Sequence, residues 1–144
     1  MNREDFAEHE IHSINTGRTL DQIGKDVVDA AYQVHKTMGP GLAEAIYQEC
    51  MEREFQRRHI PFVRQEPITI YYKDEELRTR YIADLVVEGR VIVELKAVSE
   101  LHPIFEAQLL NYLKLSNTKL GFLINFNVEL IKDGIRRRKN GYGD

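Results

Sequence analysis

Apolar residues in the first part of the chain recur every three or four positions, which is the spacing of one face of an α-helix. They are Leu20, Ile23, Val27, Ala30, Ala31 and Val34. This spacing predicts a helix over residues 20–38, which ends because Gly39-Pro40-Gly41 follows. A second helix is predicted over residues 42–59, and Pro61 ends it.

After Pro61 the pattern changes from helical to alternating. Residues 62–72 alternate loosely, and Pro67 within them indicates an edge strand or a bulge. A polar turn follows at residues 73–76. The later predicted elements are a hairpin of residues 77–87 and 90–98, a helix of residues 103–115, a buried strand of residues 119–125 and short strands at 128–131 and 135–138. The order ααβββαββ predicts an α/β or α+β domain with one central sheet.

The predicted hairpin carries Asp84, Glu94 and Lys96 inside apolar runs, although burying an unpaired charge costs several kcal/mol. Glu94 and Lys96 project from one face, because side chains two apart on a strand point the same way. A two-residue Glu88-Gly89 loop would place Asp84 on the opposite face from Glu94. A three-residue loop with Gly89 left-handed, or a kink at Asp84, restores a shared face, and we predict one of these.

Two carboxylates that converge at a strand edge favour a hard cation such as Mg²⁺. A lysine beside them would orient a water molecule or stabilise charge on a phosphate. On the spacing alone, however, a structural ion pair between Lys96 and one of the carboxylates is the simpler explanation.

Two further pairs of residues lie on helix faces. Glu44 and Tyr47 are three apart in GPGLAEAIY, and Glu44 falls in the first helical turn, where stabilisation by the helix dipole is the simpler role. Gln108 and Tyr112 are four apart in EAQLLNYLK. They form either the polar border of an apolar stripe or a hydrogen-bonding ledge over a cleft.

Composition narrows the function classes. The 144 residues suit one domain, and the single cysteine excludes an internal disulfide, a cysteine-rich zinc site and a four-cysteine iron–sulfur cluster. No apolar run approaches the roughly 18–20 residues that span a bilayer, and a cytoplasmic location without membrane contact is expected. The net charge of −3 gives no global basic field. Residues 132–139 are nevertheless strongly basic, as either a solvated end or a phosphate contact.

Four motifs in order resemble the GxxExxY family, which is placed in the PD-(D/E)XK nuclease superfamily. They are G-x-x-E-x-x-Y at 41–47, D-x9-E-x-K at 84–96, Q-x3-Y at 108–112 and GFLINF at 121–126. The third motif is similar to one of the RecB-like branch. The resemblance implies a restriction-endonuclease-like core, in which helices flank a mixed central sheet. The domain would cover residues 19–139, between a loose arm at 1–18 and a tail at 140–144.

The resemblance also implies roles for individual residues. Asp84, Glu94 and the backbone carbonyl of Leu95 would bind Mg²⁺ or Mn²⁺, with Glu44 as a further ligand. Lys96 would lie beside the attacking water, so that Glu44, Asp84, Glu94 and Lys96 form the catalytic set. Gln108 and Tyr112 would bind substrate.

The expected activity is metal-dependent hydrolysis of phosphodiester bonds in a nucleic acid, with DNA as the expected substrate. The alternative is a nucleic-acid or protein binding module that keeps the fold with little turnover. The small size suggests a homodimer or a partner protein.

Overall fold

Two helices open the part of the chain that the structure describes, residues 16–141. In this computed structural model α2 spans Leu20–Met38, as predicted, and α3 spans Glu44–Arg57, two residues inside the predicted range at each end. Thr19 caps α2: its hydroxyl accepts the Gln22 N–H at 3.1 Å, and the Gln22 side chain accepts the Thr19 N–H at 2.8 Å. This reciprocal pair satisfies two N–H groups that the first helical turn leaves without partners.

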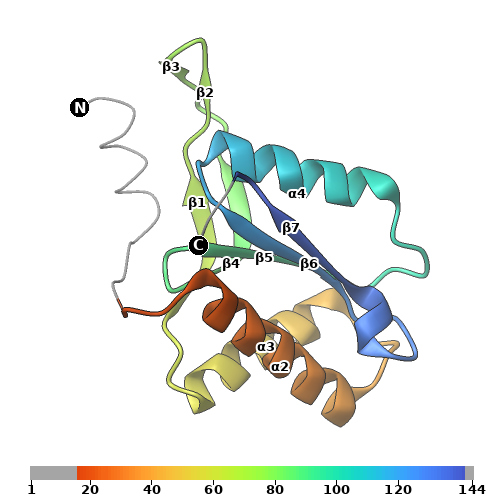
Figure 1. The fold of residues 1–144 in the computed structure, drawn as a ribbon. Coiled ribbons are helices and arrows are strands. Elements are labelled where there is room, and N and C mark those ends of the chain that lie inside the picture. Colours follow the sequence, from red (N-terminus) through yellow and green to blue (C-terminus); the bar gives the residue numbers. More distant parts are fainter. Residues whose placement is uncertain (1–15, 142–144) are drawn as a thin grey trace.

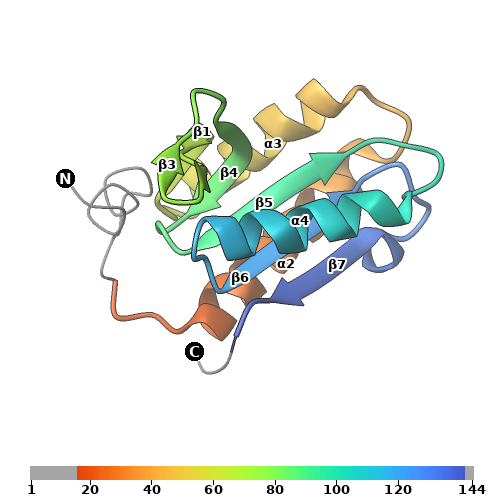
Figure 2. The same ribbon diagram turned by 90° about the horizontal axis from the view of Figure 1, so that it is seen from above.

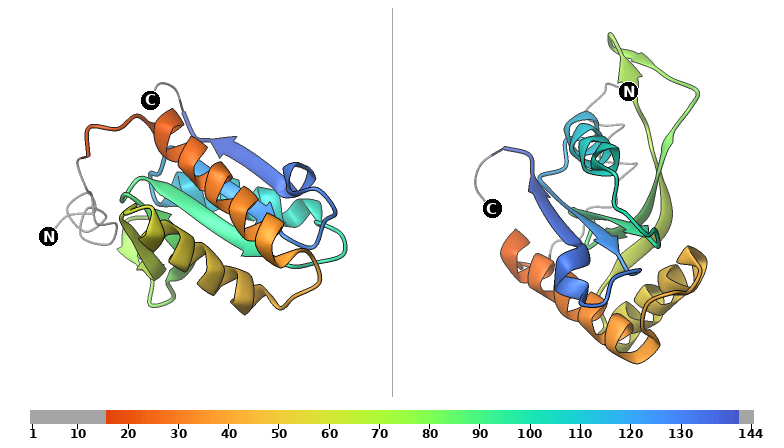
Figure 3. Two further views of the ribbon diagram at one scale, coloured as in Figure 1. Left: turned by 90° about the horizontal axis from the view of Figure 1, so that it is seen from below. Right: turned by 90° about the vertical axis from the view of Figure 1, so that its right-hand side faces the viewer.

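A five-stranded mixed sheet lies between helices on both faces (Figures 1 and 2). Its order is β1-β4-β5-β6-β7, in which β5 and β6 are parallel and the other neighbours antiparallel. The strands are β1 Phe62–Ile68, β4 Tyr81–Val87, β5 Val91–Lys96, β6 Leu120–Asn125 and β7 Ile135–Lys139. Helix α4, Pro103–Leu115, covers one face, and α2 and α3 cover the other (Figure 3). The predicted fold class, a mixed sheet flanked by helices, is confirmed.

Four local predictions were wrong. β1 ends at Ile68 rather than at residue 72, and β4 begins at Tyr81 rather than at residue 77. The polar turn at residues 73–76 is shorter than expected, because Glu75–Glu76 (β3) pairs with Tyr71–Tyr72 (β2) in a small separate sheet. The short strand predicted at residues 128–131 is absent from the described chain. A 3-10 helix, η1, spans Ile131–Gly134, and a Cβ on Gly134 would lie only 2.1 Å from the Asn125 carbonyl oxygen. The chain therefore turns too tightly here for an extended strand.

Strand β5 separates two apolar clusters. Val91, Val93 and Leu95 belong to the cluster beneath α2 and α3, and Ile92 belongs to the cluster beneath α4. Because side chains alternate along a strand, Glu94 and Lys96 emerge on the α4 side. Their shared face was predicted from their spacing and is confirmed.

The ribbon of β1 and β4 changes face at Asp84. In a regular strand Tyr81, Ala83, Leu85 and Val87 would share one face. Leu85 and Val87 instead pack in the α2–α3 cluster, whereas Tyr81 and Ala83 pack in the α4 cluster. The Cα register places Gln65 opposite Asp84, and Gln65 has a φ of 48°, a left-handed conformation that few non-glycine residues adopt. The outer half of the ribbon therefore rises beside α4, as the right-hand view of Figure 3 shows.

The loop between β4 and β5 has the predicted irregular form. Val87 pairs with Val91, so the loop has three residues, Glu88-Gly89-Arg90. Gly89 is left-handed with a φ of 67°, and Glu88 is left-handed as well, with a φ of 52°. Continuing this register places Asp84 opposite Glu94. The structure thus has both features that would give the two carboxylates a shared face, the three-residue loop and a kink at Asp84.

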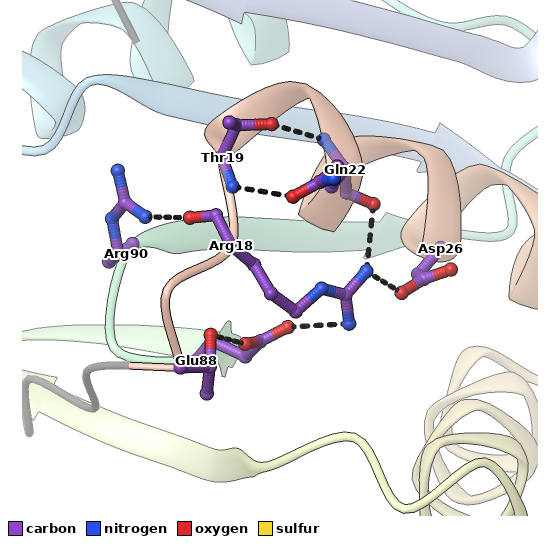
Figure 4. Close-up of polar contacts among 7 residues, drawn as sticks. Arg18, Thr19, Gln22, Asp26, Glu88 and Arg90 are labelled. Carbon is purple, nitrogen blue, oxygen red and sulfur yellow. Dashed lines mark hydrogen bonds and ion pairs between the residues drawn. The ribbon is translucent and has the colours of Figure 1, made fainter.

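A buried ion pair ties this loop to the start of α2 (Figure 4). The Glu88 side chain is fully buried and accepts hydrogen bonds from the Thr16 hydroxyl at 2.5 Å and from Arg18 at 3.2 Å. Arg18 also pairs with Asp26, and Arg90 donates to the Arg18 carbonyl at 2.6 Å. Of the predicted loose arm, residues 1–15 lie outside the described chain, and Thr16 and Arg18 take part in this network. None of the described helices is long and apolar enough to cross a membrane.

Loss of the Arg18 side chain should destabilise the protein. Arg18→Ala leaves the buried Glu88 carboxylate without its cation, so we expect the free energy of unfolding in urea to fall by about 2–3 kcal/mol. The matched control is Arg53→Ala, which breaks an exposed pair with Glu49 whose two side chains are each 69% exposed and should cost at most about 1 kcal/mol. Equal losses in the two variants would show that the Glu88 contact contributes no more than a surface pair.

Candidate functional site

Asp84 and Glu94 meet where β4 and β5 separate. The paired register ends at Leu85 and Val93, and side chains then replace backbone contacts between the strands. The Leu95 N–H donates to Asp84 Oδ2 at 2.8 Å, and the Asp84 N–H donates to Glu94 Oε1 at 3.4 Å. Each carboxylate therefore accepts a hydrogen bond from the backbone of the opposite strand, which fixes the two acids side by side.

Glu94 lies in a largely buried, aromatic environment. The Tyr81 hydroxyl donates to Glu94 Oε1, and the Tyr81 ring stacks on Tyr112 of α4 with centroids 3.7 Å apart and planes 1° apart. Burial, and next the charge of Asp84, raise the pKa of Glu94 to about 8, because few water molecules screen the two carboxylates from each other. Without a bound cation, Glu94 therefore keeps its proton up to about pH 8, and a cation would replace that proton.

Glu44 reaches the site from the first turn of α3. The preceding turn is held by Tyr47, whose hydroxyl donates to the Gly39 carbonyl at 2.6 Å and accepts the Leu42 N–H at 3.1 Å. The Tyr47 ring stacks on Phe126, 4.5 Å away. The spacing of G-x-x-E-x-x-Y thus has a physical reason, because its tyrosine fixes the turn from which its glutamate projects.

The electrostatic surroundings of Glu44 place it beside the other charged groups. Partial burial is the main cause that raises the pKa of Glu44, the positive charge of Lys96 opposes this, and the negative charge of Asp84 adds to it. The nearby Ala97 backbone also favours the charged carboxylate, which lowers the pKa of Glu44. Glu44 thus takes part in the charge balance of the strand edge, in addition to its favourable position in the first turn of a helix.

Lys96 ends β5 under the start of α4. Its Nζ lies 4.4 Å from the centroid of the Phe105 ring, a distance at which a cation is attracted to the ring face. Within residues 16–141, Lys96 forms no ion pair with Asp84 or Glu94. A structural ion pair, the simpler explanation at the level of sequence, is therefore not what the structure contains.

The buried side chain of Asn125 fixes the chain just beyond Lys96. Asn125 donates to the Val98 carbonyl and accepts the Val98 N–H, both at 3.0 Å. The Phe126 N–H donates to the Lys96 carbonyl at 2.9 Å. These contacts hold the carboxyl ends of the parallel strands β5 and β6 together at the site, which is the edge where ligands commonly bind in α/β sheets.

The two residues of Q-x3-Y differ in their surroundings. Tyr112 is half-buried and reaches Glu94 indirectly, through the stack with Tyr81. Gln108 is exposed, and its side chain forms no hydrogen bond within the described residues. The sequence interpretation missed Tyr81, because in an apolar strand it read as an ordinary core residue. The only signal was that a buried tyrosine needs a partner for its hydroxyl.

The donor set suits a divalent cation bound by few protein side chains. As the side chains lie, residues 16–141 contain no cluster of three or more His, Cys, Asp or Glu that could hold a metal ion. Asp84 and Glu94 supply two hard oxygen donors. Burial, and next the charge of Asp84, raises the pKa of Glu94, and a bound cation would offset both effects. Mg²⁺ is commonly bound through one or two carboxylates with water completing its coordination.

The basic residues near the C-terminus brace β7 between two helices. Arg136 and Arg138 both pair with Glu106 of α4. Arg137 pairs with Asp21 of α2 at 2.7 Å. Contact of this segment with a phosphate backbone stays a prediction, and it would compete with these ion pairs.

One comparison with known proteins gives a match. A family model described as PD-(D/E)XK nuclease superfamily matches residues 21–138, which include every residue of the site described above. No curated protein and no solved structure matches the chain. The finer resemblance to the GxxExxY family and to the RecB-like branch stays a prediction.

The raised pKa of Glu94 should appear in the pH dependence of stability. The pKa of Glu94 rises from its ordinary value of 4.5 to about 8 in the folded protein. Between these two pH values, Glu94 in the folded protein holds a proton that the unfolded chain has released. The free energy of unfolding should therefore fall as pH rises through this window. Glu94→Gln removes the titrating group, so urea unfolding at pH 5, 6.5 and 8 should show a flatter profile than in the wild type. Glu129→Gln, which alters an exposed carboxylate, is the control, and a Glu94→Gln profile parallel to the wild type would contradict the assignment.

Proposed function

The chain belongs to the PD-(D/E)XK nuclease superfamily, and from this membership we propose that it is a metal-dependent nuclease that hydrolyses phosphodiester bonds in DNA. The observation that carries the proposal is the pairing of Asp84 with Glu94 where β4 and β5 separate. Lys96 lies two residues further along β5, and Glu44 adds a third carboxylate from α3. These residues reproduce the spacing D-x9-E-x-K in a three-dimensional arrangement that suits metal-dependent hydrolysis.

Asp84, Glu94 and the Leu95 carbonyl would hold Mg²⁺ or Mn²⁺, with Glu44 as a further ligand. When bound, such a cation supplies polarisation of the phosphoryl group and activation of the attacking water. Asp84 and Glu94 are well prepared for this task, because hydrogen bonds from the opposite strand already fix both carboxylates.

Lys96 would place positive charge beside the reacting phosphate. Phe105 holds its ammonium group by a cation–π contact rather than by an ion pair, which leaves the N–H donors that point away from the ring available to a water molecule or a phosphate oxygen. A fixed cation next to developing negative charge lowers the barrier of hydrolysis. Gln108, exposed on α4, would contact the nucleic-acid backbone together with the accessible part of Tyr112.

A binding module with little turnover is the second candidate. The net charge of the chain is −3, and ion pairs already engage Arg136, Arg137 and Arg138. Binding to nucleic acid depends strongly on cations that are free to contact phosphate. Both features therefore favour a binding module over a nuclease that holds its substrate alone. A second copy of the chain or a partner protein would then supply the missing contacts. Residues 19–139 would form the functional domain in either case, although Arg18 stabilises it from just outside.

Metal binding and cleavage, measured on the same samples, test the proposal. Calorimetric titration of Mn²⁺ and Mg²⁺ into the wild type should show binding that the double variant Asp84→Asn/Glu94→Gln loses, because both anionic donors become neutral. Cleavage of single- and double-stranded DNA should disappear with it. Metal binding by the wild type without cleavage of any DNA or RNA would favour the binding module, and a wild type that binds neither metal would refute the nuclease.

The contribution of Lys96 can be separated from metal binding. Lys96→Gln should lower the rate of DNA cleavage on the order of 100-fold or more, while the affinity for Mn²⁺ stays close to that of the wild type. Lys119→Gln, an exposed lysine just before β6, is the matched control and should cleave at the wild-type rate. Equal rates in the wild type and Lys96→Gln would remove Lys96 from the catalytic set.

A further inference from the structure

Tyr81 stands out among the residues around the site because it reaches a proposed metal ligand and belongs to none of the motifs. Its side chain is buried, with 8% exposed, and its hydroxyl donates to Glu94 Oε1. Buried tyrosine hydroxyls find some partner in most proteins. Here the partner is one of the two carboxylates on which the proposed chemistry depends.

The face change of β4 is what brings Tyr81 to Glu94. In a regular strand Tyr81 would point the same way as Leu85, into the cluster beneath α2 and α3. Glu94 lies on the opposite face of β5, and a tyrosine beneath α2 and α3 would not reach it. The kink at Gln65 and Asp84 turns Tyr81 into the α4 cluster, so this distortion delivers a hydrogen-bond donor to Glu94.

Two hydrogen bonds restrain the Glu94 carboxylate through one oxygen. Oε1 accepts from both the Tyr81 hydroxyl and the Asp84 N–H, and the Asp84 side chain lies beside the same carboxylate. A carboxylate fixed through one oxygen has a defined orientation. Groups that fix metal ligands in this way commonly change metal affinity about 10–100-fold when they are removed.

Tyr112, on α4, restrains Tyr81, on β4. The two rings are nearly parallel, 1° apart, with centroids 3.7 Å apart, so α4 limits the orientation of the Tyr81 ring and therefore of its hydroxyl. Tyr112 itself is only half-buried and does not donate to Glu94. The ring of Tyr112 can therefore serve the Q-x3-Y motif by stacking on Tyr81. This role does not depend on the Tyr112 hydroxyl.

We propose that Tyr81 is a positioning residue that orients the Glu94 carboxylate for a divalent cation, and that Tyr112 holds Tyr81 in place by stacking. This inference rests on the proposed function, since it concerns the same metal site. It assigns Tyr81, a residue outside the sequence motifs, a role in metal affinity, and it assigns Tyr112 a role that its ring alone can fulfil.

The test compares Mn²⁺ affinity, measured by calorimetry, in three variants that differ in what they remove. Tyr81→Phe keeps the ring and loses the hydroxyl, and it should bind Mn²⁺ about 10–100-fold more weakly than the wild type. Tyr112→Phe keeps the stack and should bind as the wild type does. Tyr112→Leu removes the stack and should weaken binding several-fold, which provides a second measure if Tyr81→Phe folds poorly. Circular dichroism at the titration temperature confirms that each variant is folded.

The outcomes separate this inference from the proposed function. A wild type that binds Mn²⁺, together with folded Tyr81→Phe and Tyr112→Leu variants whose affinities lie within twofold of it, overturns the role of Tyr81 and leaves the nuclease proposal standing. Tighter binding by Tyr81→Phe also overturns it, because the hydroxyl would then compete with the cation. A wild type that binds no Mn²⁺ refutes the proposed function, and this inference with it.

Discussion

The separation of β4 from β5 at Asp84 is the feature on which the rest of the site depends. A regular antiparallel pair would continue its backbone hydrogen bonds through Asp84 and Glu94. Here each carboxylate instead accepts an N–H from the opposite strand, so the side chains satisfy backbone groups that the separation would otherwise leave without partners. The break therefore costs little in unmet hydrogen bonds, and it gathers two acids at the edge of the sheet.

The distortion is fixed at both ends of the hairpin. At the loop, Glu88 adopts a left-handed conformation while its buried carboxylate binds Arg18, which ties the three-residue loop to the start of α2. At the other end, the stack of Tyr81 on Tyr112 attaches the outer half of the ribbon to α4. Backbone strain of this kind persists only where the surroundings hold it, and here two helices on opposite faces of the sheet do so. The geometry of the acids thus depends on these contacts with α2 and α4 as well as on their own hydrogen bonds.

Much of this arrangement could be predicted from the sequence, because it follows from local rules. The helix boundaries followed from the apolar spacing and from Gly39-Pro40-Gly41. The irregular loop was predicted because a two-residue loop would place Asp84 and Glu94 on opposite faces of the hairpin. A kink at Asp84 was one of the predicted alternatives, but its counterpart at Gln65 was not foreseen, since nothing in a glutamine indicates a left-handed φ. Tyr81 was missed because its orientation depends on that kink. The 3-10 turn at Ile131–Gly134 depends on close contact with Asn125, a residue distant enough in sequence to leave no local pattern.

The charge balance of the site explains why the fold tolerates three acids around one lysine. Burial, and next the negative charge of Asp84, raises the pKa of Glu94. Lys96 offsets part of the charge around Glu44 but is held over the Phe105 ring and forms no ion pair with either hairpin acid within the described chain. A structural role alone would favour a direct ion pair or an apolar replacement. Two acids that backbone hydrogen bonds hold together, without a lysine paired to either, fit the proposed site, in which a bound cation would supply the counter-charge.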